Sequence, residues 1–134
     1  MVKNVFISLP MKGKTDKEIG NRLCSLTSRV KDACRKKFGW GEDVEIVLTD
    51  NFFDVRHPSH PADEKHKSCF YLGQAITKLA SADAIYFDEG WEHANGCLVE
   101  RFVALKYDIP VLFWNCSYEP ADEADPTREG EVKE

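Results

Sequence analysis

The stretch AIYFDEGWEHAN, residues 84–95, decides the fold of this 134-residue chain. It joins an apolar run at 84–87 to a glycine-containing turn at 88–94, and it ends at Asn95, a residue type that caps helices. A strand, a turn and a helix in this order form one unit of an α/β domain. The same order occurs twice before this stretch, and a further apolar strand follows it.

The first of these units is the most clearly marked. Its apolar run stops at Pro10, and Thr15 and Glu18 then form a capping box, in which each side chain bonds the other residue's backbone N–H. The apolar spacing predicts a helix from there to Gly39. The predicted elements are strands at 5–7, 44–48, 84–87 and 110–113 and helices at 15–38, 70–81 and 95–107.

This alternation predicts a three-layer α/β/α domain of Rossmann or flavodoxin type over residues 1–116. Nearly continuous apolar strands indicate a mostly parallel sheet of four to five strands that is covered on both faces. Ligands of such sheets bind outside the carboxyl ends of the strands. We therefore expect the functional residues in the segments 8–13, 49–66, 88–95 and 114–115.

The charge is unevenly distributed. The chain has a formal net charge of -5, but residues 117–134 hold seven acids and two bases, whereas 1–116 hold 16 of each. We expect an acidic, disordered tail behind a neutral domain that tolerates an anionic ligand. The basic residues between Arg29 and Lys37 favour a solvated helix end over a nucleic-acid polymer as partner. No run approaches the roughly 20 apolar residues of a membrane span.

The five cysteines contain no C-x-x-C unit, which predicts reduced, mostly buried thiols in a cytoplasmic protein. No basic-then-apolar leader precedes the first strand. The segment 49–66 carries His57, His60 and His66, but its prolines break helical ligand spacing, so we predict no metal site there. A loop of this length is typical of a lid or binding loop.

The third helix carries the main candidate residue, Glu100. Leu98, Phe102 and Leu105 form one bulky stripe, whereas the opposite side is small and apolar. That side consists of Gly96, Cys97, Val103, Ala104 and Tyr107, and Glu100 lies in its middle. A carboxylate beside apolar surface has a raised pKa unless donors compensate, which is typical of functional sites. Alternatively, Glu100 pairs with a nearby arginine or lysine side chain, or it caps exposed backbone groups. A helix that is apolar on two sides also predicts a homodimer or higher homo-oligomer.

The turn before this helix offers ligand contacts. Gly90 and Gly96 allow close backbone approach, and the N–H groups from Asn95 onward can face an anion. Trp91 can stack on a base or sugar, or it can close the edge of a core or an interface. Glu92 can bond a ribose hydroxyl, although a solvated turn acid is the commoner role.

Four segments resemble a known family. They are FISLPMKG at 6–13, YLG at 71–73, ADAIYF at 82–87 and the pattern GWE-x-x-x-GC-x-x-E at 90–100. Together they resemble the DUF4406 family, which is often found in phage and prophage genomes. That family is related to nucleoside 2-deoxyribosyltransferases and to N-glycosidases of deoxynucleoside 5′-monophosphates. The resemblance covers about residues 1–115 and implies a bacterial or phage-infected host cell.

The resemblance implies a small-molecule nucleoside or nucleotide as partner, with no cofactor. In the related enzymes a helix glutamate at the position of Glu100 attacks C1′ of the deoxyribose and expels the base. Ser8, Lys12 and the Asn95–Gly96 turn are then candidate phosphate contacts. The full set of candidate substrate-binding residues is Ser8, Lys12, Gly13, Asp88, Gly90, Trp91, Glu92, Asn95 and Gly96.

Two positions depart from the pattern of those enzymes. Ala75 stands where they carry an aspartate, and Phe6 where they tend to carry a tyrosine. Asp88, Glu92 or His57 could take over the lost polar role. Three hypotheses follow: an enzyme with Glu100 as nucleophile, a nucleotide binder without turnover, and a scaffold in which the third helix forms a dimer and Glu100 an intersubunit salt bridge.

Overall fold

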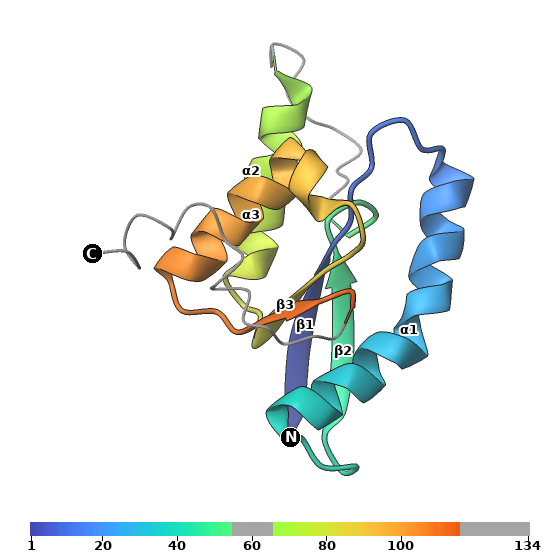
Figure 1. Cartoon of the computed structure of the whole chain (residues 1–134). Coiled ribbons are helices and arrows are strands. Elements are labelled where there is room, and N and C mark those ends of the chain that lie inside the picture. Colours follow the sequence, from blue (N-terminus) through green and yellow to red (C-terminus); the bar gives the residue numbers. More distant parts are fainter. Residues whose placement is uncertain (55–65, 116–134) are drawn as a thin grey trace.

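The computed structural model of the chain describes residues 1–54 and 66–115 (Figure 1). Its strands are β1 (Val2–Ser8), β2 (Glu45–Asp50), β3 (Ala84–Phe87) and β4 (Val111–Phe113), and its helices are α1 (Asp16–Phe38), α2 (Lys67–Leu79) and α3 (Asn95–Lys106). A short 3-10 turn, η1 (Trp91–His93), precedes α3. The predicted alternation of strands and helices is confirmed, with element ends that differ by a few residues.

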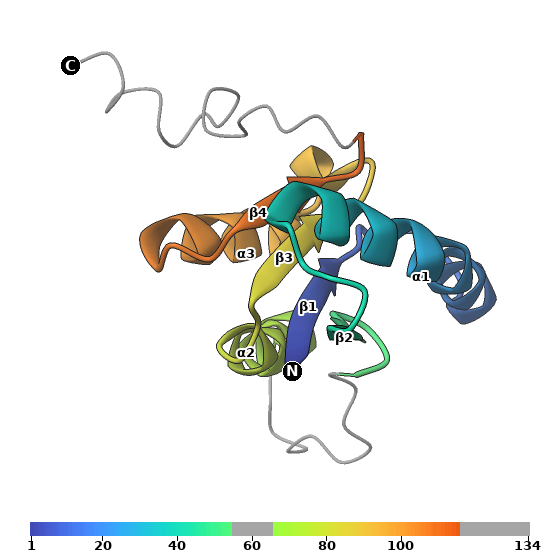
Figure 2. The ribbon, with the colours of Figure 1, turned by 90° about the horizontal axis from the view of Figure 1, so that it is seen from below.

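The four strands form one parallel sheet in the order β2-β1-β3-β4. Helix α1 covers one face, and α2 and α3 cover the other, so that the row of strands lies between them (Figure 2). This arrangement confirms the predicted three-layer α/β/α fold. From β1 the chain goes first to β2 on one side and later to β3 on the other. The topological switch point, where such sheets bind ligands, therefore lies between β1 and β3.

Each face of the sheet has its own apolar core. Tyr86 of β3 faces α1, whereas its neighbours Ile85 and Phe87 face α2 and α3, because successive strand residues point to opposite faces. The first core includes Leu26, Val30 and Cys34 of α1, and the second includes Ala75 and Leu79 of α2 and Cys97 and Ala104 of α3. The first core thus holds α1 against one face of the sheet, and the second holds α2 and α3 against the other.

The capping box at the start of α1 is confirmed. The Thr15 hydroxyl accepts a hydrogen bond from the Glu18 N–H at 3.1 Å, and the Glu18 carboxylate accepts one from the Thr15 N–H at 2.8 Å. Asn95, in contrast, is not a helix cap. The residues before it form η1, so the extended residue at the N-cap is Ala94, and Asn95 is already helical.

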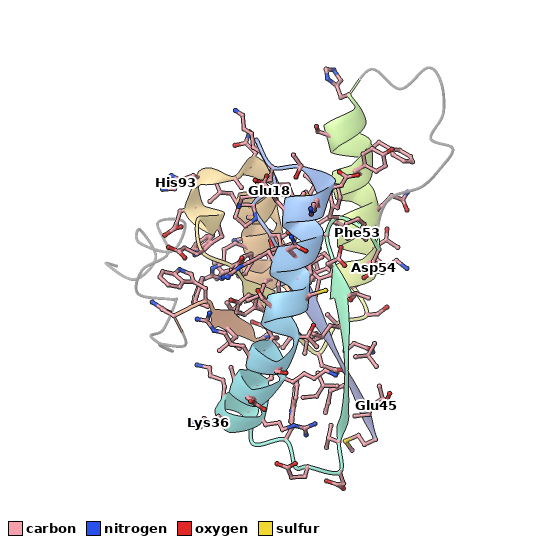
Figure 3. The ribbon with its side chains drawn as sticks, turned by 90° about the vertical axis from the view of Figure 1, so that its right-hand side faces the viewer. Glu18, Lys36, Glu45, Phe53, Asp54 and His93 are labelled. Carbon is pink, nitrogen blue, oxygen red and sulfur yellow. The ribbon has the colours of Figure 1, made fainter. Side chains whose placement is uncertain are left out.

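The carboxyl ends of the strands meet at one end of the molecule (Figure 3). Glu18, His93, Phe53 and Asp54 lie toward this end, whereas Glu45 at the start of β2 and Lys36 near the end of α1 lie at the other. We call the end that carries the strand carboxyl termini the rim. It brings the loop after β1, the segment after β2 and the turn after β3 together.

Some sequence-based expectations fall outside the described residues. These are the acidic tail at 117–134 and most of the histidine-containing segment, His57 and His60 included. Within the described ranges, no group of three or more His, Cys, Asp or Glu residues could hold a metal ion. No helix in these ranges is long and apolar enough to cross a membrane.

The cysteines are less buried than expected. Cys34 and Cys97 are buried, but Cys24 and Cys69 are exposed, and all four are free thiols. Cys24 is exposed because it lies on the outward side of α1, where the neighbouring Ser25 is exposed too. The expectation of mostly buried thiols is therefore wrong for these two residues.

Candidate functional site

Glu100 is buried on the inner face of α3, with only 1% of its surface exposed. The buried residues of this helix are Cys97, Glu100, Arg101 and Ala104, which recur at helical spacing. The prediction that Glu100 shares a buried side with Cys97 and Ala104 is confirmed, and Arg101 joins them. On the opposite side, Leu98 and Phe102 are exposed.

Ser8 supplies the closest polar contact of Glu100. Its Oγ donates a hydrogen bond to Oε1 of Glu100 at 2.5 Å, and both side chains are buried. Ser8 is the last residue of β1, so this bond joins the carboxyl end of a central strand to α3. A short hydroxyl-to-carboxylate bond of this kind is stronger than one between neutral groups.

The acidity of Glu100 reflects burial without a neighbouring positive charge. Burial raises the pKa of this carboxyl to about 7, although hydrogen bonds from Ser8 and Asn51 act to lower it. Among the residues that the structure describes, no lysine or arginine lies within salt-bridge distance of Glu100. The carboxyl therefore changes its charge near neutral pH, as a group with a functional acidity does. One turn earlier, burial raises the pKa of Cys97 to about 12, so this residue stays a thiol.

A second buried carboxylate, Asp88, lies at the same end of the sheet. It directly follows β3 and is 3% exposed. Arg22 of α1 holds it in a two-pronged ion pair, with Nε 2.8 Å from Oδ2 and Nη2 2.7 Å from Oδ1. The Tyr86 hydroxyl also donates to Oδ1, at 3.1 Å.

Asp88 remains ionised because of these donors. Burial acts to raise its pKa, but the hydrogen bonds from Arg22, the Glu89 backbone and Tyr86 outweigh burial and hold the pKa below the usual aspartate range. The Asp88 N–H donates to the Ser8 carbonyl at 3.1 Å, which continues the pairing of β1 with β3. The strand ends that carry the Glu100 partner and the Asp88 carboxylate are thus direct neighbours.

Asn51 completes the site from β2, the strand on the other side of β1. Its Oδ1 accepts a hydrogen bond from the Leu9 N–H, and its Nδ2 donates one to the Leu9 carbonyl, both at 3.1 Å. Sequence analysis missed this residue, although a polar side chain directly after a strand was an available signal. It also missed Arg22, which lies on α1 between the buried Ile19 and Leu26 and therefore faces inward.

Trp91 packs against the core, as one of its two sequence-based interpretations has it. It is 7% exposed, and its ring packs 5.2 Å from those of Phe87 and Phe113, measured between centroids. The 3-10 turn folds this side chain back over the carboxyl end of β3. Trp91 therefore closes the edge of the core, which was the alternative interpretation.

The remaining candidates lie on the outside of the rim. Lys12, Gly13, Glu92 and Asn95 are exposed, and Gly96 is half-buried. Gly90 has a φ of +91°, and a Cβ at this position would lie 3.5 Å from Cγ of Pro10. The loop after β1 and the turn after β3 therefore lie close together here, and it is the positive φ that favours glycine, since a Cβ would make only an ordinary contact.

The two positions at which the sequence departs from the enzyme pattern that it resembles lie in an apolar environment. Phe6 is fully buried and Ala75 is 2% exposed, and both belong to the core between the sheet and the pair α2 and α3. Of the three groups that could replace the lost polar side chains, Asp88 is paired with Arg22, Glu92 is exposed, and His57 lies outside the described residues.

Comparisons of the chain with family models, characterised proteins and solved structures returned no match.

Proposed function

We propose that this protein transfers or hydrolyses the sugar of a nucleoside or nucleotide at its N-glycosidic bond, with Glu100 as the carboxylate nucleophile. The observation that carries this proposal is the buried Glu100 carboxyl with the Ser8 hydroxyl 2.5 Å away. Its position beside the switch point of the sheet supports a ligand site there. The resemblance to the DUF4406 family supports this class of substrate.

The chemistry proceeds in two displacements. An Oε atom of Glu100 bonds to C1′ of the sugar while the C1′–N bond breaks, and the electron pair of that bond goes to the base nitrogen, which takes a proton from water. A glycosyl ester of Glu100 remains. Water or a second base then attacks C1′, the carboxylate leaves, and the attacking group releases its proton to solvent. A carboxylate suits both steps because it stabilises the oxocarbenium-like transition state and then bonds to it.

The surroundings of Glu100 fit this role. The nucleophile must be ionised, and a pKa of about 7 allows this at and above neutral pH. Donation from Ser8 stabilises the ionised form, whereas burial keeps the carboxylate poorly solvated and reactive. Because Glu100 is 1% exposed, the sugar reaches it only when side chains at the rim part.

The outer rim residues supply the remaining contacts in this proposal. Lys12 provides a positive charge for a phosphate, and the first N–H groups of α3 have no acceptor within the helix. Gly13, Gly90 and Gly96 allow the backbone to approach the ligand. We also propose a homodimer or higher oligomer through the exposed apolar residues Leu98, Val99 and Phe102, in the cytoplasm of a bacterial or phage-infected cell.

A nucleotide binder without turnover is the second candidate. It is favoured by the apolar surroundings of Phe6 and Ala75, which leave Glu100 without the polar groups that the related enzymes carry at these positions. In that case Glu100, when protonated, would donate a hydrogen bond to the ligand. Binding would then raise the thermal stability without releasing a base.

The test is to incubate the protein with ribo- and deoxyribonucleosides and their 5′-monophosphates and to measure free base by chromatography. We expect release by the wild type and a loss of at least about a thousandfold in Glu100→Gln, since this variant lacks the nucleophile. Glu45→Gln is the matched control, because Glu45 is exposed at the far end of the sheet (Figure 3). No release by the wild type above that of Glu100→Gln would exclude the enzyme for this set of substrates.

A further inference from the structure

The side chain of Asn51 extends the pairing of β1 with β2 beyond the last backbone bond. The backbone N–H of Asn51 donates to the Ile7 carbonyl at 3.1 Å. From there its amide takes over, since it accepts from the N–H and donates to the carbonyl of Leu9. The next residue, Pro10, has no N–H, so the ladder cannot continue.

This contact between the Asn51 amide and the Leu9 backbone is buried, and it leaves one N–H of the amide unused. Asn51 is 5% exposed and Leu9 is 3% exposed, so the polar groups of both need partners within the protein. An asparagine amide has two N–H bonds, and the bond to Leu9 uses one of them. Asn51 also lowers the pKa of Glu100, so its amide lies near that carboxyl.

One amide group therefore acts on both partners of the closest contact in the site. It fixes the backbone of Leu9, the residue that follows Ser8, and Ser8 donates to Glu100 at 2.5 Å. It also faces the Glu100 carboxyl itself. Three elements that are distant in sequence, the ends of β1 and β2 and the inner face of α3, meet at this carboxyl.

We propose that Asn51 is the positioning residue of this site, because its planar amide holds the Ser8 segment and the Glu100 carboxyl in a fixed relation, so that two neutral donors converge on the nucleophile. The inference rests on the proposed function and adds a residue to it. A residue that served only to finish the strand pairing would satisfy Leu9 without affecting Glu100.

Three charged or titratable groups lie close to this part of α3. Cys97 precedes Glu100 by one turn, and the charges of Asp88 after β3 and of Lys14 in the loop after β1 act on Cys97. None of these three donates a hydrogen bond that lowers the pKa of Glu100, whereas Ser8 and Asn51 do. A change at Asn51 should therefore be seen directly at the Glu100 carboxyl.

The test is an NMR titration of the side-chain carboxyl carbons in protein with ¹³C-labelled glutamate, with Glu100 assigned by its absence in Glu100→Gln. Asn51→Asp keeps the acceptor for Leu9 but replaces the donor with a negative charge, and Asn51→Ser replaces the amide with a shorter hydroxyl. We expect the pKa of Glu100 to rise in both, with an about tenfold fall in its ionisation constant for Asn51→Asp and a smaller fall for Asn51→Ser. Asn21→Asp, an exposed site on α1, should leave it unchanged.

A measurement on the wild type covers the case in which the variants do not fold. The side-chain amide protons of Asn51 should titrate with the same midpoint as Glu100, because one of them faces the carboxyl. Amide signals that do not move through this pH range would overturn the inference. So would an unchanged Glu100 pKa in folded Asn51 variants of reduced stability, since Asn51 would then only finish the strand.

Neither NMR measurement needs a substrate, so the two proposals can fail separately. If the wild type releases no base, the proposed function is wrong, whereas a missing shift of the Glu100 pKa contradicts the role of Asn51 alone. In an active protein, the acid limb of the kcat/KM profile should move with the Glu100 pKa in Asn51→Ser. A loss of kcat/KM that is the same at every pH would contradict a positioning role.

Discussion

Glu100 and Asp88 are two carboxyls of nearly equal burial at the same end of the sheet, yet they differ in acidity. Glu100 is 1% and Asp88 3% exposed. The pKa of Glu100 is raised to about 7, whereas that of Asp88 is held below its usual range. Burial raises the pKa of both and acts more strongly on Glu100, which lies deeper, and the different partners then separate the two further.

The partners differ in number and, above all, in charge. Asp88 has a guanidinium, a phenol and a backbone N–H as donors, and Glu100 has a hydroxyl and an amide. An opposite charge at hydrogen-bond distance compensates for the loss of hydration, and neutral donors do so only in part. Asp88 therefore carries a fixed structural charge, whereas Glu100 gains and loses a proton near neutral pH.

The largest expected effect is the pH dependence of base release. If Glu100 is the nucleophile, kcat/KM should rise with pH as its carboxyl ionises, and Asp88, which is already ionised, should contribute nothing above pH 5. Between pH 5 and pH 8 the ionised fraction of a group with a pKa of about 7 rises by about a hundredfold. A kcat/KM that does not change over this range would contradict the role of Glu100 as the nucleophile with a raised pKa.

The next effect concerns the stability of Glu100→Gln. Because the folded pKa of Glu100 lies above the unfolded one, the folded state binds more protons between pH 4.5 and 7 and loses stability as the pH rises through this range. The glutamine variant lacks this loss. Its free energy of unfolding, measured in urea, should therefore rise by roughly 2.5 kcal/mol relative to that of the wild type between pH 5 and pH 8. An equal difference at both pH values would show that burial does not disfavour the charge.

Arg22→Met, in contrast, should lower the free energy of unfolding. It leaves Asp88 buried without its cation, and since the Arg22 side chain is 37% exposed, we expect a loss of about 2 kcal/mol at pH 7 rather than the full cost of a buried pair. The folded pKa of Asp88 is depressed, so this contribution is present above the unfolded pKa and is lost below the folded one.

The check on Arg22→Met is urea unfolding at pH 7 and pH 3. The difference from the wild type should be smaller at pH 3, because Asp88 without its cation takes up a proton more readily than the paired Asp88. Lys17→Met, an exposed site on the same helix, is the control for the loss of one positive charge. A loss of equal size at both pH values would mean that Arg22 stabilises α1 by packing alone.

Ser8→Ala should have the smallest effect. Removing the hydroxyl leaves Glu100 with one fewer donor, so its pKa should rise and kcat/KM at pH 6.5 should fall by about tenfold, the cost of roughly 1.4 kcal/mol. The loss should shrink toward pH 9, where Glu100 is ionised in both proteins. Ser25→Ala, on the exposed side of α1, provides the control.

Local patterns predicted the elements of this fold because their causes are local. The capping box of α1 lies within four residues, and Gly39 ends the same helix with a φ of 68°. The position of Glu100 on a small, apolar side of α3 was predictable too, but not that this side is the buried one, since the stripe of Leu98 and Phe102 is also apolar and yet exposed. Trp91 was ambiguous, because nothing in a turn sequence shows whether an aromatic side chain folds outward or back over the core.

The contacts that define the site were not predictable, since they join distant positions. Ser8 and Glu100 are 92 residues apart, Arg22 and Asp88 are 66 apart, and Leu9 and Asn51 are 42 apart. Sequence analysis named both members of the first pair and Asp88 of the second as candidate residues, but it could not show which side chains meet. Asn51 was missed because its role depends on the backbone of β1.

The sequence by itself determined the alternation of strands and helices, the two ends of α1 and the placement of a carboxylate on an apolar helix face, because helix and strand periodicities act over a few residues. Only the tertiary structure decided which carboxylate keeps its charge. That choice depends on the groups within a few ångströms of each carboxyl, and the parallel sheet brings these groups from four separate parts of the chain to one rim.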